Sequence, residues 1–304
     1  EAPHLCVSVP ALLPSGVAFY GAAALGAYPL DMSQYANLFA STRLPGLEKD
    51  ELVVAPASSH VCVLRNGNVY KVDVLDREGA TLPLPEIHGA LQAVADAADA
   101  APAPADEGLG VLTTLPRDQW AGLRSRIEGA SEANAASLNV IDSALFVLSL
   151  EAGKPSSMLE SCSFFLHGSG VDRWFDKSFS LIVASDGQAA VNFEHAWGDG
   201  VAVLRFFNEV YELSTKMPLT SPVPASIEPT KAEFDLPAEV KAAVVDAKKV
   251  FDATVGRTEL ALLQAEFFNS KMLKTSRLSP DGAMQMAFQL AHVKMHGGPL
   301  LPST

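Results

Sequence analysis

Two dipeptides, Asn66-Gly67 and Asp186-Gly187, constrain the fold of this chain more than any other feature. Each separates two short apolar runs, and residues that tolerate positive φ at such a point are the strongest local signal for a β-hairpin. The sequence therefore predicts one hairpin over residues 61–75 and a second one whose strands cover residues 179–184 and 189–194. Two hairpins commit strands to antiparallel pairs, which favours a mixed or antiparallel sheet over a doubly wound parallel one.

The segments around the hairpins carry mostly helical periodicity. Apolar residues recur at the spacing of one helical face, and proline or an N-cap residue stands at several starts. We predict a buried strand over residues 144–150 and helices over residues 85–99, from Pro116, after Gly200, from Pro237 to a stop at Gly256, and from Ser279-Pro280 to Gly297. The expected fold class is α/β, in its α+β form, with a mixed β-sheet and flanking helices.

The second hairpin leads into the sequence VNFEHAWGDG, residues 191–200. His195 stands where the return strand ends, and a histidine there is a candidate general base because its unperturbed pKa is about 6.5. Asp199 can reach back to orient it, whereas Glu194 should point to the opposite face of the strand. The plain alternatives are a structural histidine and an aspartate that only caps the next helix. The spacing alone leaves these alternatives open.

The charge of the chain argues against one class of partner. Its net charge of −13 is unfavourable for a nucleic-acid binder. The last 74 residues carry nine Lys and Arg against eight Asp and Glu, and the first 230 carry 13 against 27. A site for a polyanion is therefore expected in the C-terminal part, as a local cluster. The three cysteines lack metal-ligand spacing, so no metal site is expected, and they fit free thiols in a reducing compartment.

Residues 5–30 carry no charged side chain, and the stretch is long enough to raise the question of a membrane span. The prolines and glycines that interrupt it are Pro10, Pro14, Pro29, Gly16, Gly21 and Gly26. A buried pair of short elements is the favoured interpretation. Contact with a membrane surface is the alternative left open.

Several segments together resemble the choline/carnitine acyltransferase family. The strongest are RWFDKS, residues 173–178, and FEHAWGDGVAVLRFFNEV, residues 193–210. Further matches lie at residues 27–45, 63–76 and 277–291, so the similarity runs in order along nearly the whole chain. The resemblance implies a chloramphenicol-acetyltransferase-like acyltransferase domain.

The same resemblance implies roles for individual residues. His195 corresponds to the catalytic base, which deprotonates the carnitine hydroxyl or, in reverse, the coenzyme A thiol. Asp199 corresponds to the acidic residue that helps to hold the histidine. Transfer is expected to be direct, without an acyl-enzyme. Arg173, Asp176 and Lys177 are expected to form an ion-pair network beside the site.

A basic loop near the C-terminus also gains a role from the resemblance. Sequence alone allows either a solvated charge cluster or a phosphate site before a helix N-terminus. In the family this loop binds coenzyme A, so coenzyme A or acyl-CoA is expected as a substrate and no covalently bound cofactor is expected. Ser270 stands where lysine is usual and Gly282 where alanine is usual, which we expect to weaken these contacts. The residues concerned are Lys271, Lys274, Arg277, Ser279 and Asp281.

Two domains are expected, with the proline-rich residues 216–232 as their linker. Residues 1–225 correspond to the His-bearing acyltransferase domain without the family's N-terminal segment. Residues 226–304 correspond to the start of the second related domain, truncated before the carnitine-binding half. We therefore expect a missing segment or a partner chain to complete this second domain.

The expected function is reversible transfer of a long-chain acyl group between coenzyme A and L-carnitine, in fatty acid metabolism. By resemblance, the expected location is the matrix side of the inner mitochondrial membrane, with peripheral membrane contact. The alternative left open is a truncated, catalytically inactive relative that serves as a structural subunit of a larger assembly.

Overall fold

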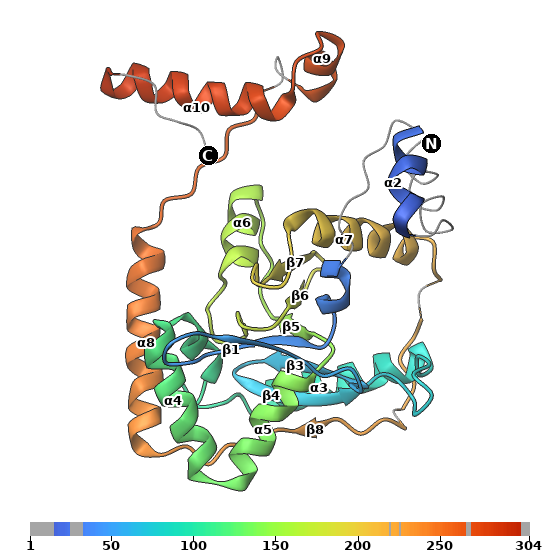
Figure 1. Ribbon diagram of the computed structural model, residues 1–304. Coiled ribbons are helices and arrows are strands. Elements are labelled where there is room, and N and C mark those ends of the chain that lie inside the picture. The colour runs from blue at the N-terminus through green and yellow to red at the C-terminus, as the bar shows by residue number, and fades with distance from the viewer. Residues whose placement is uncertain (1–14, 25–32, 219, 225, 266–268, 299–304) are drawn as a thin grey trace. The chain divides into compact units, whose positions relative to one another are not determined.

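The core of the fold is a six-stranded mixed sheet (Figure 1). The computed structural model describes residues 15–24, 33–218, 220–224, 226–265 and 269–298. Within them the strand order is β7-β6-β5-β3-β4-β8. β5 pairs in parallel with β3 and with β6, and the other pairs are antiparallel. This confirms the predicted α/β fold with a mixed sheet. The strand bounds are β3 (His60–Arg65), β4 (Asn68–Asp73), β5 (Val147–Glu151), β6 (Phe179–Ala184), β7 (Ala189–Phe193) and β8 (Thr230–Lys231).

Both predicted hairpins are present. β3 and β4 join through Asn66 and Gly67, whose φ angles of 50° and 76° are the left-handed values that this turn requires. β6 and β7 join through a longer turn in which Gly187 has a φ of 87°. A second, two-stranded sheet pairs β1 (Ser41–Leu44) with β2 (Glu51–Val54).

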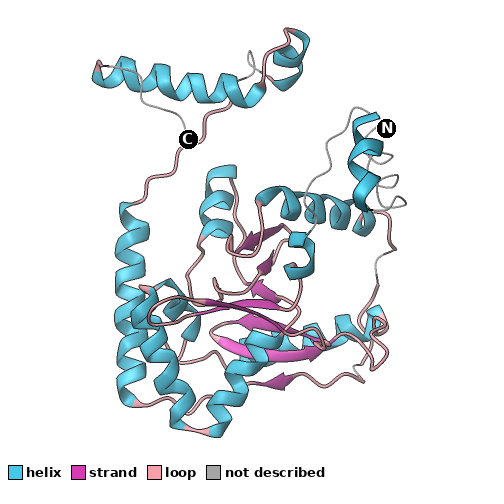
Figure 2. Ribbon diagram, viewed as in Figure 1, coloured by secondary structure: helices cyan, strands magenta, loops and turns pink. Residues whose placement is uncertain are grey.

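Within the first compact unit, residues 15–259 where described, helices lie on both faces of the central strands (Figure 2). Pro116 is the N-cap residue of its helix, and Pro85 is the second residue of its helix. Proline is tolerated at both positions because the N–H that it lacks would have no acceptor within the helix. Gly256 does not stop its helix as predicted, because the helix continues to Arg257. The helices are α2 (Ser15–Ala24), η1 (Ser33–Asn37), α3 (Leu84–Ala100), η2 (Leu109–Thr114), α4 (Arg117–Ala130), α5 (Glu132–Ser143), α6 (Met158–Leu166), α7 (Gly200–Ser214), α8 (Ala238–Arg257), α9 (Ser270–Thr275) and α10 (Pro280–His296).

Both faces of the central strands are buried, because alternate residues of β3 belong to different clusters. Cys62 and Leu64 pack with η2, α4, α5 and α8 on one face. Val61 and Val63 pack with α3 on the other face. This explains why β3 is a nearly continuous apolar run and not an alternating one. The central strands are therefore a rigid platform for the loops at their ends.

The proline-rich residues 216–232 do not behave only as a linker. Their end forms β8, which pairs with β4 at the sheet edge, and α8 then packs against the core through Val240, Val244 and Ala247. The chain divides into two compact units, Glu1–Glu259 and Leu260–Thr304. The predicted domain boundary between residues 225 and 226 stays a prediction.

Of the uncharged residues 5–30, only 15–24 lie among the described residues, where they form α2. The exposed fractions of Val17 and Tyr20 are 47% and 71%, so this part is not buried as expected. The rest of the stretch lies outside the described residues. Among the helices that the structure describes, none combines the length and the apolar character needed to cross a bilayer.

Candidate active site

His195 lies two residues after the end of β7, where the chain leaves the sheet. The N–H of Glu194 still donates to the carbonyl oxygen of Ser178 at 3.0 Å, and the chain then turns toward α7. The His195 side chain is 70% exposed. The Phe193 ring lies beside it, with 5.6 Å between ring centroids. An imidazole at a strand end, supported on one side and open on the other, is accessible to a substrate.

Asp199 is oriented toward His195 by a third residue, Gln34. Asp199 occupies the N-cap position of α7, yet its side chain makes no capping hydrogen bond. Its Oδ1 lies 4.0 Å from His195 Nε2, an ion-pair distance that is too long for a hydrogen bond. Its Oδ2 accepts from Gln34 Nε2 at 3.0 Å, and its N–H donates to Gln34 Oε1 at 2.8 Å. The plain helix-cap interpretation of Asp199 therefore does not fit the geometry.

Trp197 anchors the loop between His195 and α7. Its indole Nε1 donates to the carbonyl oxygen of Ser178 at 2.6 Å. Its ring is buried in a cluster with Leu38, Phe179 and Val203. Trp197, two residues after His195, thus holds the loop to Ser178, the residue before β6, which couples the position of the imidazole to the sheet.

The RWFDKS segment is a buried ionic layer. Arg173 pairs with Glu151 on β5. Asp176 Oδ1 accepts from Arg117 Nη1 at 2.6 Å, and its Oδ2 accepts from the indole N–H of Trp120 at 2.7 Å. Burial raises the pKa of the Asp176 carboxyl, although these two donors oppose the effect. These contacts are those of a structural support.

Lys177 was expected to belong to an ion-pair network, but its amine binds neutral oxygen atoms instead. It is almost fully buried, and its Nζ donates to Thr42 Oγ1 at 2.8 Å and to the backbone oxygen of Asp142 at 2.6 Å. The Asp142 carboxylate is paired with Arg124 instead. Burial lowers the pKa of the Lys177 amine to about 7.

The candidate coenzyme A residues lie in the second compact unit, Leu260–Thr304. Ser279 caps α10, as predicted, by accepting from the Gly282 N–H at 3.2 Å. Arg277 has a φ of 59°, a left-handed value that turns the chain between α9 and α10. The side chains at the predicted positions are all exposed. These positions are Lys271 and Lys274 on α9, Arg277 in the turn, and Ser279 and Asp281 at the start of α10.

The profile model of the Choline/Carnitine o-acyltransferase family matches residues 12–301. The chain belongs to the choline/carnitine O-acyltransferase family.

Two kinds of relative show where the chain falls within the choline/carnitine O-acyltransferase family. It is 44% identical over 291 residues to human "Carnitine O-palmitoyltransferase 2, mitochondrial", covering 94% of this chain and 44% of that protein. The Xenopus tropicalis protein of the same name is 43% identical with the same coverage. The human muscle isoform of carnitine O-palmitoyltransferase 1 is 33% identical, covering 90% of this chain and 37% of that protein. The chain therefore spans less than half the length of these relatives.

Sequence reasoning did not single out Gln34 as a candidate site residue. Its one signal was that residues 27–45 resemble the choline/carnitine O-acyltransferase family as a block. Gln34 lies in η1, and Gly198 gives it room, since a Cβ there would lie 3.3 Å from Gln34 Oε1. A contact across 165 positions has no local pattern that sequence reading can detect.

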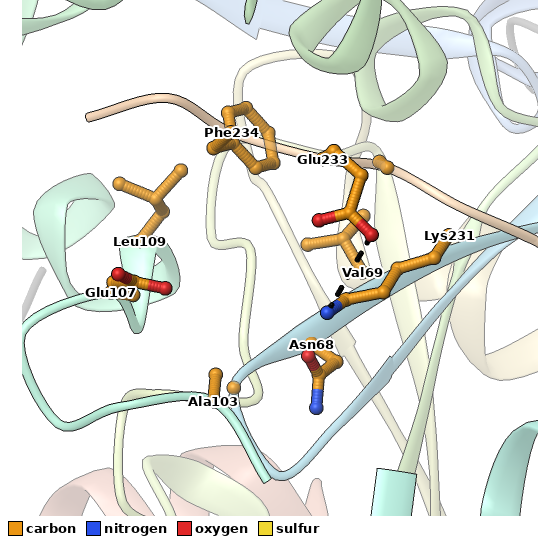
Figure 3. Close-up of a pocket in the computed structure, with 10 residues that line it drawn as sticks. Asn68, Val69, Ala103, Glu107, Leu109, Lys231, Glu233 and Phe234 are labelled. Carbon is orange, nitrogen blue, oxygen red and sulfur yellow. Dashed lines mark ion pairs between the residues drawn. The ribbon is translucent and has the colours of Figure 1, made fainter. Parts of the chain in front are cut away.

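A pocket lies elsewhere, between the β3–β4 hairpin and the segment that follows β8 (Figure 3). Lys231 and Glu233 form an ion pair across its edge at 3.7 Å. None of the site residues predicted from the family resemblance lines this pocket. Among the described residues, no group of His, Cys, Asp and Glu side chains could hold a metal ion.

Proposed function

We propose that this chain is part of a carnitine O-acyltransferase that moves a long-chain acyl group reversibly between coenzyme A and L-carnitine. Its relatives are carnitine O-palmitoyltransferases by name, and palmitoyl is a long-chain acyl group. The observation that carries the proposal is the exposed His195 at the end of β7, with the Asp199 carboxylate held 4.0 Å away by Gln34.

In this proposal His195 is the general base. The neutral imidazole takes the proton of the carnitine hydroxyl as its oxygen attacks the thioester carbonyl. The new C–O bond forms, the C–S bond breaks, and the imidazolium returns the proton to the departing thiolate. In the reverse direction the coenzyme A thiol is deprotonated instead. Asp199 favours the imidazolium formed midway, because opposite charges at ion-pair distance attract.

Coenzyme A is the proposed ligand of the basic loop. Lys271, Lys274 and Arg277 are exposed cations before the N-terminus of α10, and both features favour a phosphate. Ser279 and Asp281 are the proposed contacts for the rest of the molecule. Coenzyme A enters and leaves as a substrate.

We further propose that carnitine contacts come from outside this sequence, from another segment or a partner chain. The support is that the chain spans only 44% of the human relative. The corresponding domain proposal places the His-bearing domain at residues 1–225 and the start of the second at 226–304. The proposed location is the mitochondrial matrix, at the inner membrane, by likeness to relatives named as mitochondrial.

The test is the His195→Ala variant of the intact protein, assayed for palmitoyl transfer from palmitoyl-CoA to L-carnitine. A positioned general base contributes roughly 100- to 10,000-fold, so we expect a loss of that order with an unchanged thermal midpoint. His296→Ala, an exposed histidine at the end of α10, is the matched control and should retain activity. Full activity in His195→Ala would refute the assignment. Absence of transfer in the unaltered protein would favour an inactive structural subunit.

A further inference from the structure

Five charged residues of alternating sign form a continuous ion-pair network that ends beside His195. Asp176 Oδ1 lies 2.6 Å from Arg117 Nη1, and Arg117 Nε lies 2.7 Å from Asp50 Oδ2. The same Asp50 oxygen lies 2.6 Å from Arg43 Nε. Arg43 Nη1 in turn lies 3.2 Å from Glu194 Oε1. This ion-pair network therefore connects the buried RWFDKS segment to Glu194, the residue that precedes the histidine.

The three carboxylates of the ion-pair network are largely shielded from water, so their ion pairs help to hold the side chains in place. The exposed fractions of the Asp176, Asp50 and Glu194 side chains are 4%, 12% and 18%. Burial pushes the pKa of the Asp50 carboxyl upward, but the Gly46 N–H and the two arginines outweigh burial and hold it below its usual value. Charge-assisted hydrogen bonds of this kind are stronger than neutral ones.

Arg43 is held both through its backbone and through its guanidinium. Its backbone N–H donates to the Asp176 carbonyl oxygen at 2.8 Å, and the preceding residue, Thr42, forms a bridge with Lys177. The guanidinium uses two different nitrogens, Nε for Asp50 and Nη1 for Glu194. A planar guanidinium keeps these two directions fixed, which a lysine ammonium cannot do.

Glu194 passes this constraint to the histidine loop. Its Oε1, the oxygen that Arg43 contacts, also accepts from the Ala196 N–H at 2.9 Å. Its backbone N–H donates to Ser178. His195 is thus bracketed by two residues, Glu194 and Ala196, whose positions depend on one carboxylate oxygen.

We propose that Arg43 is a positioning residue for His195, acting through the Glu194 carboxylate and the Ala196 N–H that it binds. This inference rests on the proposed role of His195 as general base. Arg43 fixes the direction in which the backbone presents the imidazole. Losing it leaves His195 present but misaligned.

The first experiment measures the loop directly, by hydrogen exchange in the intact protein. In Arg43→Met we expect faster exchange of the Ala196 N–H, because its acceptor is released, while the β5–β6 ladder keeps its protection. The matched control is Arg126→Met, which removes an exposed arginine paired with Glu239 at 3.7 Å. Unchanged exchange at Ala196 in Arg43→Met would overturn the proposal whether or not the protein is active.

The second experiment separates positioning from binding in the palmitoyl-transfer assay. Misalignment of a reacting group by about 1 Å can cost up to about 100-fold, so kcat of Arg43→Met should fall by about 10- to 100-fold. KM for palmitoyl-CoA should change little, and Arg43→Lys should recover part of the loss. Glu194→Gln and the double variant complete a cycle in which the two effects do not add.

The outcomes of this second experiment are distinct from those of the His195 test. If His195→Ala abolishes transfer and Arg43→Met leaves kcat unchanged, the proposed function stands and the role of Arg43 is refuted. Additive effects of Arg43→Met and Glu194→Gln would also refute it, because Arg43 would then act independently of Glu194. If the unaltered protein shows no transfer, the proposed function fails and the exchange experiment decides whether Arg43 orders the loop.

Discussion

Gln34 and Asp199, 165 positions apart in the sequence, hold each other through two hydrogen bonds. The amide of Gln34 binds both the carboxylate and the backbone N–H of Asp199, which orients the aspartate side chain. That orientation leaves Oδ1 as the oxygen nearest to His195 Nε2. The pair joins η1 to the start of α7, two elements that local sequence patterns do not connect.

Replacing Gln34 by alanine should reduce transfer without unfolding the protein. Asp199 would be free to rotate away from His195, and we expect kcat to fall by about tenfold through loss of alignment. Gln34→Glu should be worse, since it places a second carboxylate beside Asp199. The matched control is Gln92→Ala, which removes a surface glutamine bonded to Asp96 at 2.8 Å on α3. A kcat equal to that of the unaltered protein in both Gln34 variants would contradict this role.

Reversing the charge at Lys274 should weaken the use of acyl-CoA. In Lys274→Glu we expect KM for palmitoyl-CoA to rise by about three- to tenfold, because an exposed ion pair becomes a repulsion. Lys249→Glu on α8, where the side chain is 70% exposed, is the charge-matched control. Palmitoyl-dephospho-CoA, which lacks the 3′-phosphate, should be used equally well by Lys274→Glu and the unaltered protein. A persistent difference with that substrate would place the contact elsewhere on coenzyme A.

Trp120→Phe should destabilise the fold through one buried hydrogen bond. The indole N–H donates to Asp176 Oδ2, and a buried acceptor left without its donor costs about 1–3 kcal/mol. Trp174→Phe is the internal control, because Trp174 Nε1 is buried without a hydrogen-bond partner among the described residues. The two rings are almost fully buried and pack edge-to-face at 5.9 Å, so each change removes the same atoms from a buried indole. If the two variants lose the same free energy of unfolding in urea, the hydrogen bond contributes nothing to stability.

Lys177 should make the stability of the protein depend on pH above neutrality. Burial lowers its pKa to about 7 from the ordinary 10.5, so between these values the unfolded chain binds more protons than the folded one. The free energy of unfolding should then rise with pH, by at most about 1.4 kcal/mol per pH unit. Burial raises the pKa of Cys62 to about 12 from 9.0 and gives the opposite slope above pH 9. The measurement therefore belongs between pH 7 and 9.

The comparison variants for this slope are Lys177→Met and Lys248→Met. Lys177→Met should flatten the slope between pH 7 and 9, because the titrating amine is gone. Lys248 pairs with Asp252 at the surface of α8, and its removal should leave the slope unchanged. A slope that persists in Lys177→Met would mean that another group titrates in this window.

Much of the fold near the site was readable from local patterns. The dipeptides Asn66-Gly67 and Asp186-Gly187 predicted both hairpins, because few residues accept the left-handed backbone conformation that such turns require. The junction from strand to helix that carries His195 was predicted, as was the Ser279 cap of α10. The stop at Gly256 was wrong, because glycine inside a helix is tolerated where packing of the helix outweighs its intrinsic cost.

Long-range contacts account for what local patterns missed. Nothing near Lys177 in the sequence indicates that its amine reaches Thr42. Nothing near Arg43 indicates that it connects Asp50 to Glu194. Such contacts depend on which strands become neighbours, and the pairing of β5 with both β3 and β6 joins segments far apart in the chain.

By itself, the sequence determined the hairpins, the helix starts and the place of His195 at a strand end, because these depend on backbone preferences and on the spacing of apolar residues within a few positions. Only the tertiary structure decided that Gln34 orients Asp199 and that Arg43 braces Glu194. These partners come together because Leu38, just after η1, is buried with Phe179, Trp197 and Val203, and because the β1 backbone bonds to residues 176–178. Burial of this kind acts between segments far apart in the chain and not between neighbouring residues.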